Sequence, residues 1–357
     1  MKILYGVQGT GNGHISRARA MQKEFAKTDI EVDWLFSGRD KDKYFCMKDF
    51  KNSDYRKGLT FHVENGKVNY FKTALELNLK QFKKDIKSIN SYNYDLIITD
   101  FEPITAWVGK KTDIPVIGLG HQYVFNFSIP QKKGDIFSRF VLNKFAPVKS
   151  YLALHWHHFN QNILPPIIET HTHKSNIVIE NKVLVYLPFE NQHQVLRSLA
   201  PLKSFNFTVY APKPINSFAK NVNFKPLSRD GFLCDLYNCD AVLANAGFEL
   251  SSEVISLGKR LLVRPLDGQV EQHSNAIALE ALKYGKTIKA LNSRYINNEL
   301  DLAERVQVNY PNVAEYIVKW IKNGMLQRDE NWYSNIWQGV EVKREFSNNQ
   351  FGSLVYN

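Results

Sequence analysis

Residues 245–276 read NAGFELSSEVISLGKRLLVRPLDGQVEQHSNA, a pattern that predicts a turn, a helix, a buried strand, a loop and a second helix. Gly247 stands at the turn, where the backbone either adopts a positive φ or comes close to another group. Ser251 and Ser252 are expected to open the first helix, whose free N–H groups and dipole favour an anion. The sequence therefore predicts an anion site at this helix end.

Two acidic residues and an amide accompany the predicted anion site. Glu253 follows Gly247 by six residues, and Glu271 and Gln272 open the second helix. In such a site phosphates take the helix end, a carboxylate accepts hydrogen bonds from two ribose hydroxyls, and an amide binds sugar hydroxyls. This combination suits a nucleotide sugar.

The same stretch resembles the donor-binding segment of GT-B glycosyltransferases. It is similar to the family that adds N-acetylglucosamine to lipid-linked muramyl-pentapeptide, and more loosely to the plant UDP-glycosyltransferases. There a glycine is followed after six residues by a ribose-binding Glu, and a sugar-binding Gln precedes an Asn-Ala pair. By this resemblance the donor-binding candidates are Leu227, Asn245, Gly247, Phe248, Ser251, Glu253, Glu271, Gln272 and Asn275.

The chain departs from the plant enzymes at the phosphate site. Those enzymes carry a phosphate-binding His where this chain has Asn245, and an Asn-Ser pair where it has Glu249 and Leu250. The resemblance thus implies that backbone N–H groups carry more of the phosphate binding here.

Composition limits the class of protein. A chain of 357 residues with 44% hydrophobic and 13% aromatic residues predicts two folded domains. No apolar run is long enough to span a bilayer, and the first residues lack the features of a signal peptide. Three cysteines make neither a disulfide framework nor a zinc site, so we expect a cytoplasmic protein without a bound metal or cofactor. The net charge of +11 favours acidic partners, but no nucleic-acid-binding motif accompanies it, so nucleic acid is not expected.

A glycine loop follows the first predicted strand. Residues 2–7 are apolar, residues 8–14 read QGTGNGH, and an amphipathic helix comes next. The loop fails the dinucleotide fingerprint, which needs a third Gly where His14 stands, and it lacks the Lys of a Walker loop. It resembles the GT-B acceptor loop, which also ends in His. By this resemblance His14 is the catalytic base, since a neutral imidazole can take a proton from a hydroxyl, and Asn12 and Gly13 lie on the acceptor side. Arg17, one helical turn after His14, is an acceptor-side candidate that could face the same cleft, and a solvated side chain is an equal alternative. Alternatively, His14 caps the helix or contacts the other domain.

An acidic motif ends a second buried strand. Residues 94–99 lead into Asp100, Phe101, Glu102 and Pro103. Parallel strands place ligand-binding side chains at their carboxyl ends. In the plant enzymes an Asp at this strand end orients the catalytic His, which implies that Asp100 holds His14. Glu102 is the competing partner or an acceptor ligand, and Asp100 could instead cap the next helix.

Three further features of the first half are candidates for a role. His121 follows the next strand and is expected on the acceptor side of the cleft. Residues 123–150 mix aromatic and basic side chains, which suggests contact with the inner face of an anionic membrane, although a core-facing helix is an equal alternative. Five histidines lie between residues 155 and 173, but no Cys or carboxylate set frames them as a metal site.

The second half repeats the alternation of strand and helix. We expect strands at residues 182–187, 206–210, 222–224, 241–244 and 260–263. This rhythm predicts an α/β fold with two doubly wound, Rossmann-like parallel-sheet domains that face each other across a cleft. The predicted domains are residues 1–168, which bind the acceptor, and residues 169–325, which bind the donor. Residues 326–357 are expected to form a helical tail that packs back on the first domain.

The resemblance implies an inverting, metal-independent glycosyltransferase that uses a nucleotide-diphosphate sugar, UDP being the first candidate. The acceptor would be a hydroxyl, lipid-linked or on a cell-envelope glycan. A prokaryotic branch of these enzymes shares the glycine loop–His–x–Ser–Arg and Asp-Phe-Glu-Pro elements. The alternatives are a nucleotide-sugar 2-epimerase of the same fold and a non-catalytic binder of nucleotide sugars or polyanions at a membrane surface.

Overall fold

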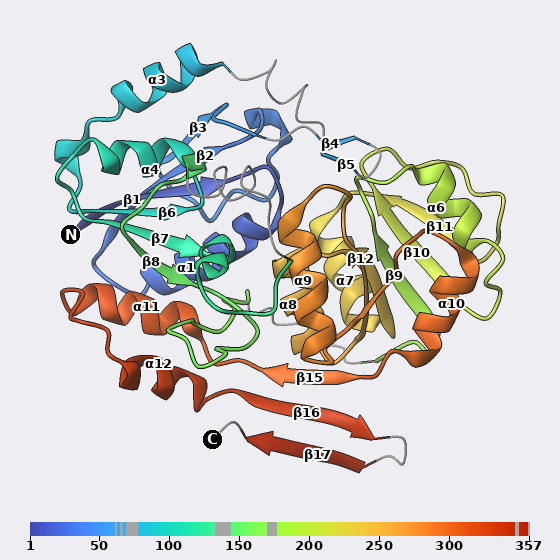
Figure 1. Ribbon diagram of the computed structural model, residues 1–357. Helices are drawn as coiled ribbons and strands as arrows, with labels where there is room; N and C mark the ends of the chain where they lie inside the picture. Colours follow the sequence, from blue (N-terminus) through green and yellow to red (C-terminus); the bar gives the residue numbers. More distant parts are fainter. Residues whose placement is uncertain are drawn as a thin grey trace.

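The computed structural model describes residues 1–60, 63–64, 67–68, 78–132, 144–169, 177–346 and 350–355. Two α/β domains lie side by side, each built around a six-stranded sheet (Figure 1). We call the domain of β1–β8 the first domain and the domain of β9–β14 the second domain. The predicted fold class is therefore confirmed, whereas the exact domain boundaries remain a prediction.

The sheet of the first domain has the strand order β3-β2-β1-β6-β7-β8, and all its pairs are parallel. Its strands are β1 (Lys2–Gln8), β2 (Glu31–Ser37), β3 (Ser53–Arg56), β6 (Leu96–Asp100), β7 (Val116–Gly120) and β8 (Ser150–Ala153). Its helices are α1 (Gly13–Phe25), α3 (Leu79–Ser88) and α4 (Pro103–Lys110), with 3-10 turns η1 (Lys41–Lys43), η2 (Ser91–Asn93) and η3 (His121–Asn126). A short antiparallel pair, β4 (Val63–Glu64) and β5 (Lys67–Val68), stands apart from the sheet.

The second domain repeats this topology with the order β11-β10-β9-β12-β13-β14, again with parallel pairs. Its strands are β9 (Lys182–Tyr186), β10 (Asn206–Ala211), β11 (Val222–Pro226), β12 (Ala241–Asn245), β13 (Arg260–Arg264) and β14 (Lys286–Thr287). Its helices are α6 (Gln192–Leu199), α7 (Arg229–Asn238), α8 (Phe248–Ser256), α9 (Val270–Ala281) and α10 (Ser293–Leu302).

The strand order positions the site in each domain. The direction in which successive strands are added to the sheet reverses between the neighbouring strands β1 and β6 in the first domain, and between β9 and β12 in the second. Ligands of open parallel sheets bind outside the carboxyl ends of the strands at this reversal. β1 and β6 consist almost wholly of buried residues, as expected for strands covered on both faces. The glycine loop follows β1 and Asp100 ends β6, so both lie at the reversal point.

The last part of the chain crosses back to the first domain. α11 (Val313–Lys322) packs on α1, where the Nδ2 of Asn312 donates to the Oε1 of Glu24 at 2.9 Å. α12 (Glu330–Trp337) follows, and the Nε1 of Trp337 donates to the carbonyl of Ile163 at 2.7 Å. Side chains of both domains and of these two helices share one apolar core cluster. The two domains are therefore held together by a common core as well as by the chain.

The prediction of a wholly helical tail is wrong beyond α12. Strands β16 (Glu341–Phe346) and β17 (Gln350–Val355) form an antiparallel sheet with β15 (Val306–Asn309). Gly339 follows the end of α12, and Val342, on β16, is buried against the core. β16 pairs with a strand more than thirty residues earlier in the chain, a partner that local sequence does not reveal.

Polar caps decide where two of the helices begin. α3 begins at Leu79, and the side chain of Asn78 before it accepts the N–H of Gln81. α6 begins at Gln192, because the side chain of Asn191 accepts the N–H groups of His193 and Gln194.

Candidate active site

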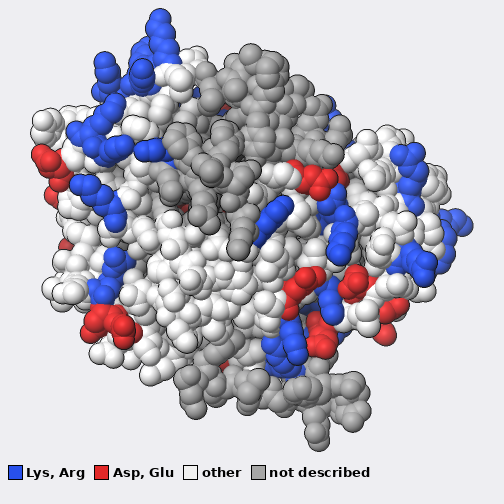
Figure 2. Space-filling view, viewed as in Figure 1, with Lys and Arg blue, Asp and Glu red and all other residues white. Residues whose placement is uncertain are grey.

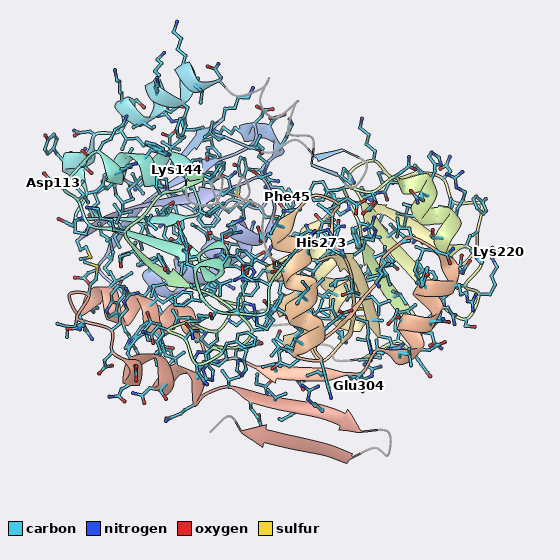
Figure 3. All side chains as sticks on the ribbon, viewed as in Figure 1. Phe45, Asp113, Lys144, Lys220, His273 and Glu304 are labelled. Atoms are coloured by element: carbon cyan, nitrogen blue, oxygen red, sulfur yellow. The ribbon has the colours of Figure 1, made fainter. Side chains whose placement is uncertain are left out.

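A cleft of about 760 Å³ lies between the two domains and is lined by residues of both. The first domain contributes the glycine loop and the start of α1; the second contributes the first turns of α8 and α9. Phe45 lines this cleft and is labelled where the two domains meet, far from Asp113 and Lys220 at the outer ends (Figure 3). The volume lies in the range of small-molecule sites.

His14 and Asp100 form a hydrogen-bonded pair at the cleft. The Nδ1 of His14 lies 2.6 Å from the Oδ1 of Asp100. Asp100 is fully buried, whereas His14 is partly exposed and lines the cleft. Nδ1 also lies 2.9 Å from the Nη2 of Arg17, but a guanidinium only donates and a carboxylate only accepts, so the shorter contact with Asp100 assigns the hydrogen to Nδ1. Nε2 has no hydrogen bond to any residue in the described ranges. The arrangement leaves Nε2 able to accept a proton from a ligand in the cleft.

The turn after β6 separates the roles of the two acids that compete for His14. Phe101 adopts a left-handed conformation (φ 50°), which lets Asp100 face α1 while Glu102 turns toward α4. Glu102 caps α4 by accepting the N–H groups of Ile104 and Thr105, and it also accepts the Ser37 hydroxyl. Glu102 is fully buried and does not line the cleft. The alternatives that Glu102 partners His14 or binds acceptor, and that Asp100 caps the helix, are wrong.

Arg17 connects this pair to the second domain. Its Nε donates to the Oδ2 of Asp100 at 2.7 Å, its Nη2 donates to the Oδ1 of Asp100, and its Nη1 donates to the Oε1 of Glu249 on α8. Burial alone would lower the pKa of Arg17, but the two carboxylates raise it above its ordinary value. Likewise, burial alone would raise the pKa of Asp100, but the charges of Arg17 and His14 lower it. Asp100 is therefore a permanent anion beside His14.

Glu249 was not among the residues predicted for the site. In the sequence it is only a departure from the plant pattern, since an acid in a first helical turn is common. The carboxylate of Glu249 bridges the domains to Arg17, and a Cβ on Gly13 would lie only 2.7 Å from its Cγ. Burial raises the pKa of Glu249 to about 7 against the charge of Arg17. In the sequence, the glycine at position 13 is an indirect sign of this contact, because a residue with a Cβ would collide with Glu249.

The helix end expected to bind phosphate begins earlier than predicted. Gly247 caps α8, so the free N–H groups belong to residues 248–250 and not to Ser251. The N–H of Ser251 donates to the carbonyl of Gly247, and its side chain is buried outside the cleft. Gly247 has a φ of −78°, so of the two alternatives predicted for it, a positive φ or a close approach, the positive φ does not apply. No described atom lies within 4 Å of a Cβ built there. The backbone at Gly247 is thus open to close approach from the cleft.

Glu253 lines the cleft one turn further along α8. It lies close to Glu169, Arg19 and Arg229, and its carboxylate makes no hydrogen bond to any residue that the structure describes. Burial and the neighbouring carboxylates of Glu249 and Glu169 raise the pKa of Glu253 to about 8. A partly buried acid without a protein donor is suited to accept hydrogen bonds from a ligand in the cleft.

Several other predicted residues surround the same cleft. The Oε1 of Gln272 accepts the N–H of Leu266 at 3.0 Å, while Glu271 accepts from Gln122 of the first domain at 3.2 Å. Asn245 ends β12 with its Oδ1 buried and without a described partner. The predicted residues that line the cleft are Asn12, Gly13, His14, Arg17, His121, Leu227, Asn245, Gly247, Phe248, Glu253, Glu271 and Gln272.

His121, Phe248 and Asn275 form a contact between the domains. The rings of His121 and Phe248 stack at 4.0 Å, and the His121 Nε2 lies 2.6 Å from the Asn275 Oδ1. The other ring nitrogen of His121 lies 2.9 Å from the carbonyl of Leu154, and the Asn275 amide donates to the carbonyl of Ala246. The polar atoms of His121 and Asn275 are thus occupied within the protein. Burial lowers the pKa of His121.

The remaining predicted features are segment 123–150 and the histidines between residues 155 and 173, and part of each lies outside the described residues. In segment 123–150, residues 133–143 lie outside the described ranges, and Phe125, Phe127 and Phe145 pack against a core cluster. His155, His157 and His158 each accept an N–H from two residues further on, and burial lowers the pKa of His157 to about 4. Residues 170–176, which include two further histidines, are not described. No described side chains form a cluster suited to a metal ion, and no described helix has the length and hydrophobicity to cross a bilayer.

Comparison with known proteins identifies the family. The family model of glycosyl transferase family 1 matches residues 1–302. An uncharacterized glycosyltransferase of Methanosarcina mazei is 23% identical over 331 residues, which cover 81% of this chain and 86% of the relative.

Two solved structures show the same fold at low identity. The spinosyn rhamnosyltransferase SpnG, complexed with thymidine diphosphate, is 11% identical with a TM-score of 0.56, covering 85% of this chain and 91% of that one. MurG of Acinetobacter baumannii is 13% identical with a TM-score of 0.51, covering 90% of this chain and all of that one. With its two parallel sheets and the cleft between them, the chain belongs to glycosyl transferase family 1 and has the GT-B fold.

Proposed function

We propose that the protein is an inverting, metal-independent glycosyltransferase that moves a sugar from a nucleotide-diphosphate donor to a hydroxyl acceptor. The observation that carries this proposal is the His14–Asp100 pair, whose free ring nitrogen lines the cleft opposite the open start of α8. A base on one wall and an anion site on the other are what in-line displacement at an anomeric carbon requires.

The proposed reaction uses the protein's own groups at each step. The Nε2 of His14 takes the proton of the acceptor hydroxyl as the oxygen attacks the anomeric carbon. The bond from that carbon to the diphosphate oxygen breaks, and the sugar inverts its configuration. The nucleoside diphosphate carries the electron pair away, and the N–H groups of residues 248–250 stabilise its charge. Asp100 orients the ring of His14 and balances the imidazolium.

We assign Glu253 to the ribose of the donor. Its partly buried carboxylate lacks a donor among the described residues, and Glu253 lies six residues after the open backbone of Gly247. SpnG was solved with thymidine diphosphate, so thymidine nucleotides join UDP as candidates. We also assign Leu227 to contact with the base, because it is exposed in the cleft beside the cap of α7.

Calorimetric titration with UDP, GDP, TDP and their sugar conjugates, without added metal, tests this assignment. We expect micromolar binding of one nucleotide and a loss of about 1–3 kcal/mol in Glu253→Ala, since charge-assisted hydrogen bonds disappear. Ribose hydroxyls favour the carboxylate form, and the pKa of Glu253 is about 8 in the free protein. Affinity for the nucleotide sugar should therefore rise about tenfold or more from about pH 6.5 to about pH 8.5.

The matched controls are Glu253→Gln, which should bind without this pH dependence, and Glu280→Ala on the exposed face of α9, which should bind as the wild type does. Equal affinity of Glu253→Ala and wild type would remove Glu253 from the donor site. If no nucleotide binds at all, the donor assignment as a whole is wrong.

An epimerase would share the donor site but need no acceptor. Incubation with the donor alone separates the two reactions, because an epimerase converts the sugar while it stays attached to the nucleotide. A transferase instead gives free nucleoside diphosphate and a glycosylated acceptor. Conversion of the donor without release of diphosphate would favour the epimerase.

A basic surface supports membrane contact as a second proposal. Lys and Arg side chains gather over α3 at the top of Figure 2. Lys80, Lys83, Lys84 and Lys87 are exposed on this helix, and none pairs with a carboxylate in the described part of the chain. Such a face would attract anionic lipid.

Replacement of these four lysines by Gln should weaken binding to vesicles that contain phosphatidylserine. Each lysine near the surface contributes about 1 kcal/mol, so we expect a loss of at least tenfold at low salt, measured by co-sedimentation. A control variant with Gln at Lys203, Lys213 and Lys220, exposed on the second domain, should bind normally. Equal loss in both variants, or no vesicle binding by the wild type, would contradict the membrane contact.

A further inference from the structure

A continuous chain of contacts runs from His14 across the cleft to the second domain. His14 is hydrogen-bonded to the carboxylate of Asp100. The Nε and Nη2 of Arg17 donate hydrogen bonds to the same carboxylate, and the Nη1 of Arg17 donates to Glu249. Arg17 is only 1% exposed, so no water replaces these partners. Its guanidinium thus uses separate N–H groups for the acid of its own domain and for the acid of the other domain.

Glu249 also packs closely against the first domain, in addition to its ion pair with Arg17. Gly13 precedes His14 on α1, and a Cβ there would lie 2.7 Å from the Cγ of Glu249. The aliphatic part of Glu249 therefore packs on the backbone that presents His14. In addition, α1 and α8 pack against each other along this line.

We propose that Glu249 is a positioning residue for His14: from the second domain it holds Arg17 against Asp100, and so aligns His14 only while the two domains are in contact. The inference rests on the proposed function, in which His14 is the base. Because the guanidinium is planar and rigid, a hydrogen bond from Nη1 to Glu249 also fixes the direction of Nε and Nη2, which donate to Asp100. Asp100 in turn keeps the hydrogen of His14 on Nδ1. The donor-side helix and the base are thereby linked through buried groups.

The charges around Glu249 set the pH range in which this link operates. Arg17, Asp100, His14 and Glu271 face it, and Glu253 lies further along the same helix. With a pKa of about 7, Glu249 is ionised above neutral pH and loses its charge as the pH falls. Effects of its replacement should therefore be larger at about pH 8 than at about pH 6.

The Glu249→Gln variant tests the inference, because it keeps the size of the side chain and removes the charge. We expect kcat at about pH 8 to fall about tenfold. This is less than the loss expected on removal of His14, because the base is still present and only its alignment is impaired. The KM for the donor should stay unchanged or fall, because an anion near the diphosphate has been removed. Glu249→Asp, which keeps the charge on a shorter side chain, should recover part of the lost kcat.

A second readout does not depend on activity. In ¹⁵N-labelled wild type, NMR of the His14 ring should show the hydrogen on Nδ1, and Glu249→Gln should show a mixture of tautomers. Ser252→Ala is the matched control, since Ser252 lies on the same helix and accepts another interdomain hydrogen bond, from Trp156 at 2.8 Å. This control should keep both the tautomer and the pH profile of the wild type.

The outcomes separate the inference from the proposed function. Wild-type kcat and a single tautomer in Glu249→Gln would overturn the inference while leaving His14 as the base. Equal defects in Glu249→Gln and Ser252→Ala would also overturn it, because general loosening of the domains would explain both. If the wild type transfers no sugar, the proposed function fails, and the ring tautomer alone decides whether Glu249 aligns His14.

Discussion

His14→Ala should lose about 10²–10⁴-fold in kcat, the usual contribution of a general base, while donor affinity barely changes. The ring lies on the wall of the first domain, bonded to Asp100, and its Nε2 is open to the cleft. The predicted donor groups belong to α8 and α9 of the second domain, so removal of the imidazole leaves them in place. Initial rates with saturating donor, together with calorimetry of nucleotide binding, measure the two effects separately.

The exposed His193 on α6 provides the matched control, and His193→Ala should turn over as the wild type does. Added imidazole should restore part of the rate in His14→Ala, because the deletion leaves space beside Asp100. Undiminished turnover of His14→Ala would exclude this residue as the base. A large loss of nucleotide affinity would instead indicate that His14 belongs to the donor site.

Asp100→Asn should have the second largest effect, on stability as well as on turnover. Asp100 is fully buried and accepts hydrogen bonds from His14 and twice from Arg17. An amide in its place leaves a buried guanidinium short of a counter-charge, a change that costs about 3–5 kcal/mol. It also removes the acceptor that keeps the hydrogen of His14 on Nδ1, so kcat should fall about 10²–10⁴-fold in the protein that remains folded.

Asp240→Asn separates the two effects. Asp240 is also buried, and it pairs with two arginines, Arg260 and Arg305. However, it lies at the amino-terminal end of β12, whereas the cleft lies at the carboxyl ends of the strands. This control should lower the free energy of unfolding similarly and leave the kcat of the folded fraction unchanged. Urea unfolding followed by circular dichroism, with rates normalised to folded protein, makes the comparison. Normal turnover in folded Asp100→Asn would remove Asp100 from the proposed mechanism.

Much of the fold follows from local sequence. Alternating apolar strands and amphipathic helices predict the two parallel sheets, because strands covered on both faces must be apolar and each crossover needs a helix. The glycine loop before His14 and the acid after residues 94–99 mark the strand ends where parallel sheets bind ligands. The tail was predicted less well, since β16 is stabilised by β15, a partner distant in the chain.

The candidate site, like the fold, could be predicted only in part from the sequence. Sequence and family resemblance are sufficient to nominate His14, Asp100, Glu253 and Gln272, because these residues occur at fixed distances from glycines and strand ends. They are not sufficient to choose between Asp100 and Glu102. That choice depends on the left-handed turn at Phe101, which directs one acid to α1 and the other to the start of α4.

The sequence by itself therefore determined the layers, the strand ends and the residues available there, since periodicity and spacing are properties of neighbouring positions. Only the tertiary structure decided which of those residues meet across the cleft. Arg17 and Glu249 are 232 positions apart, and each alone is an ordinary charged residue on a helix. Their pairing, like the stacking of His121 on Phe248, depends on how the two domains dock around their shared core. No local pattern encodes that docking, because the buried surface that stabilises it is assembled from both domains and the returning helices.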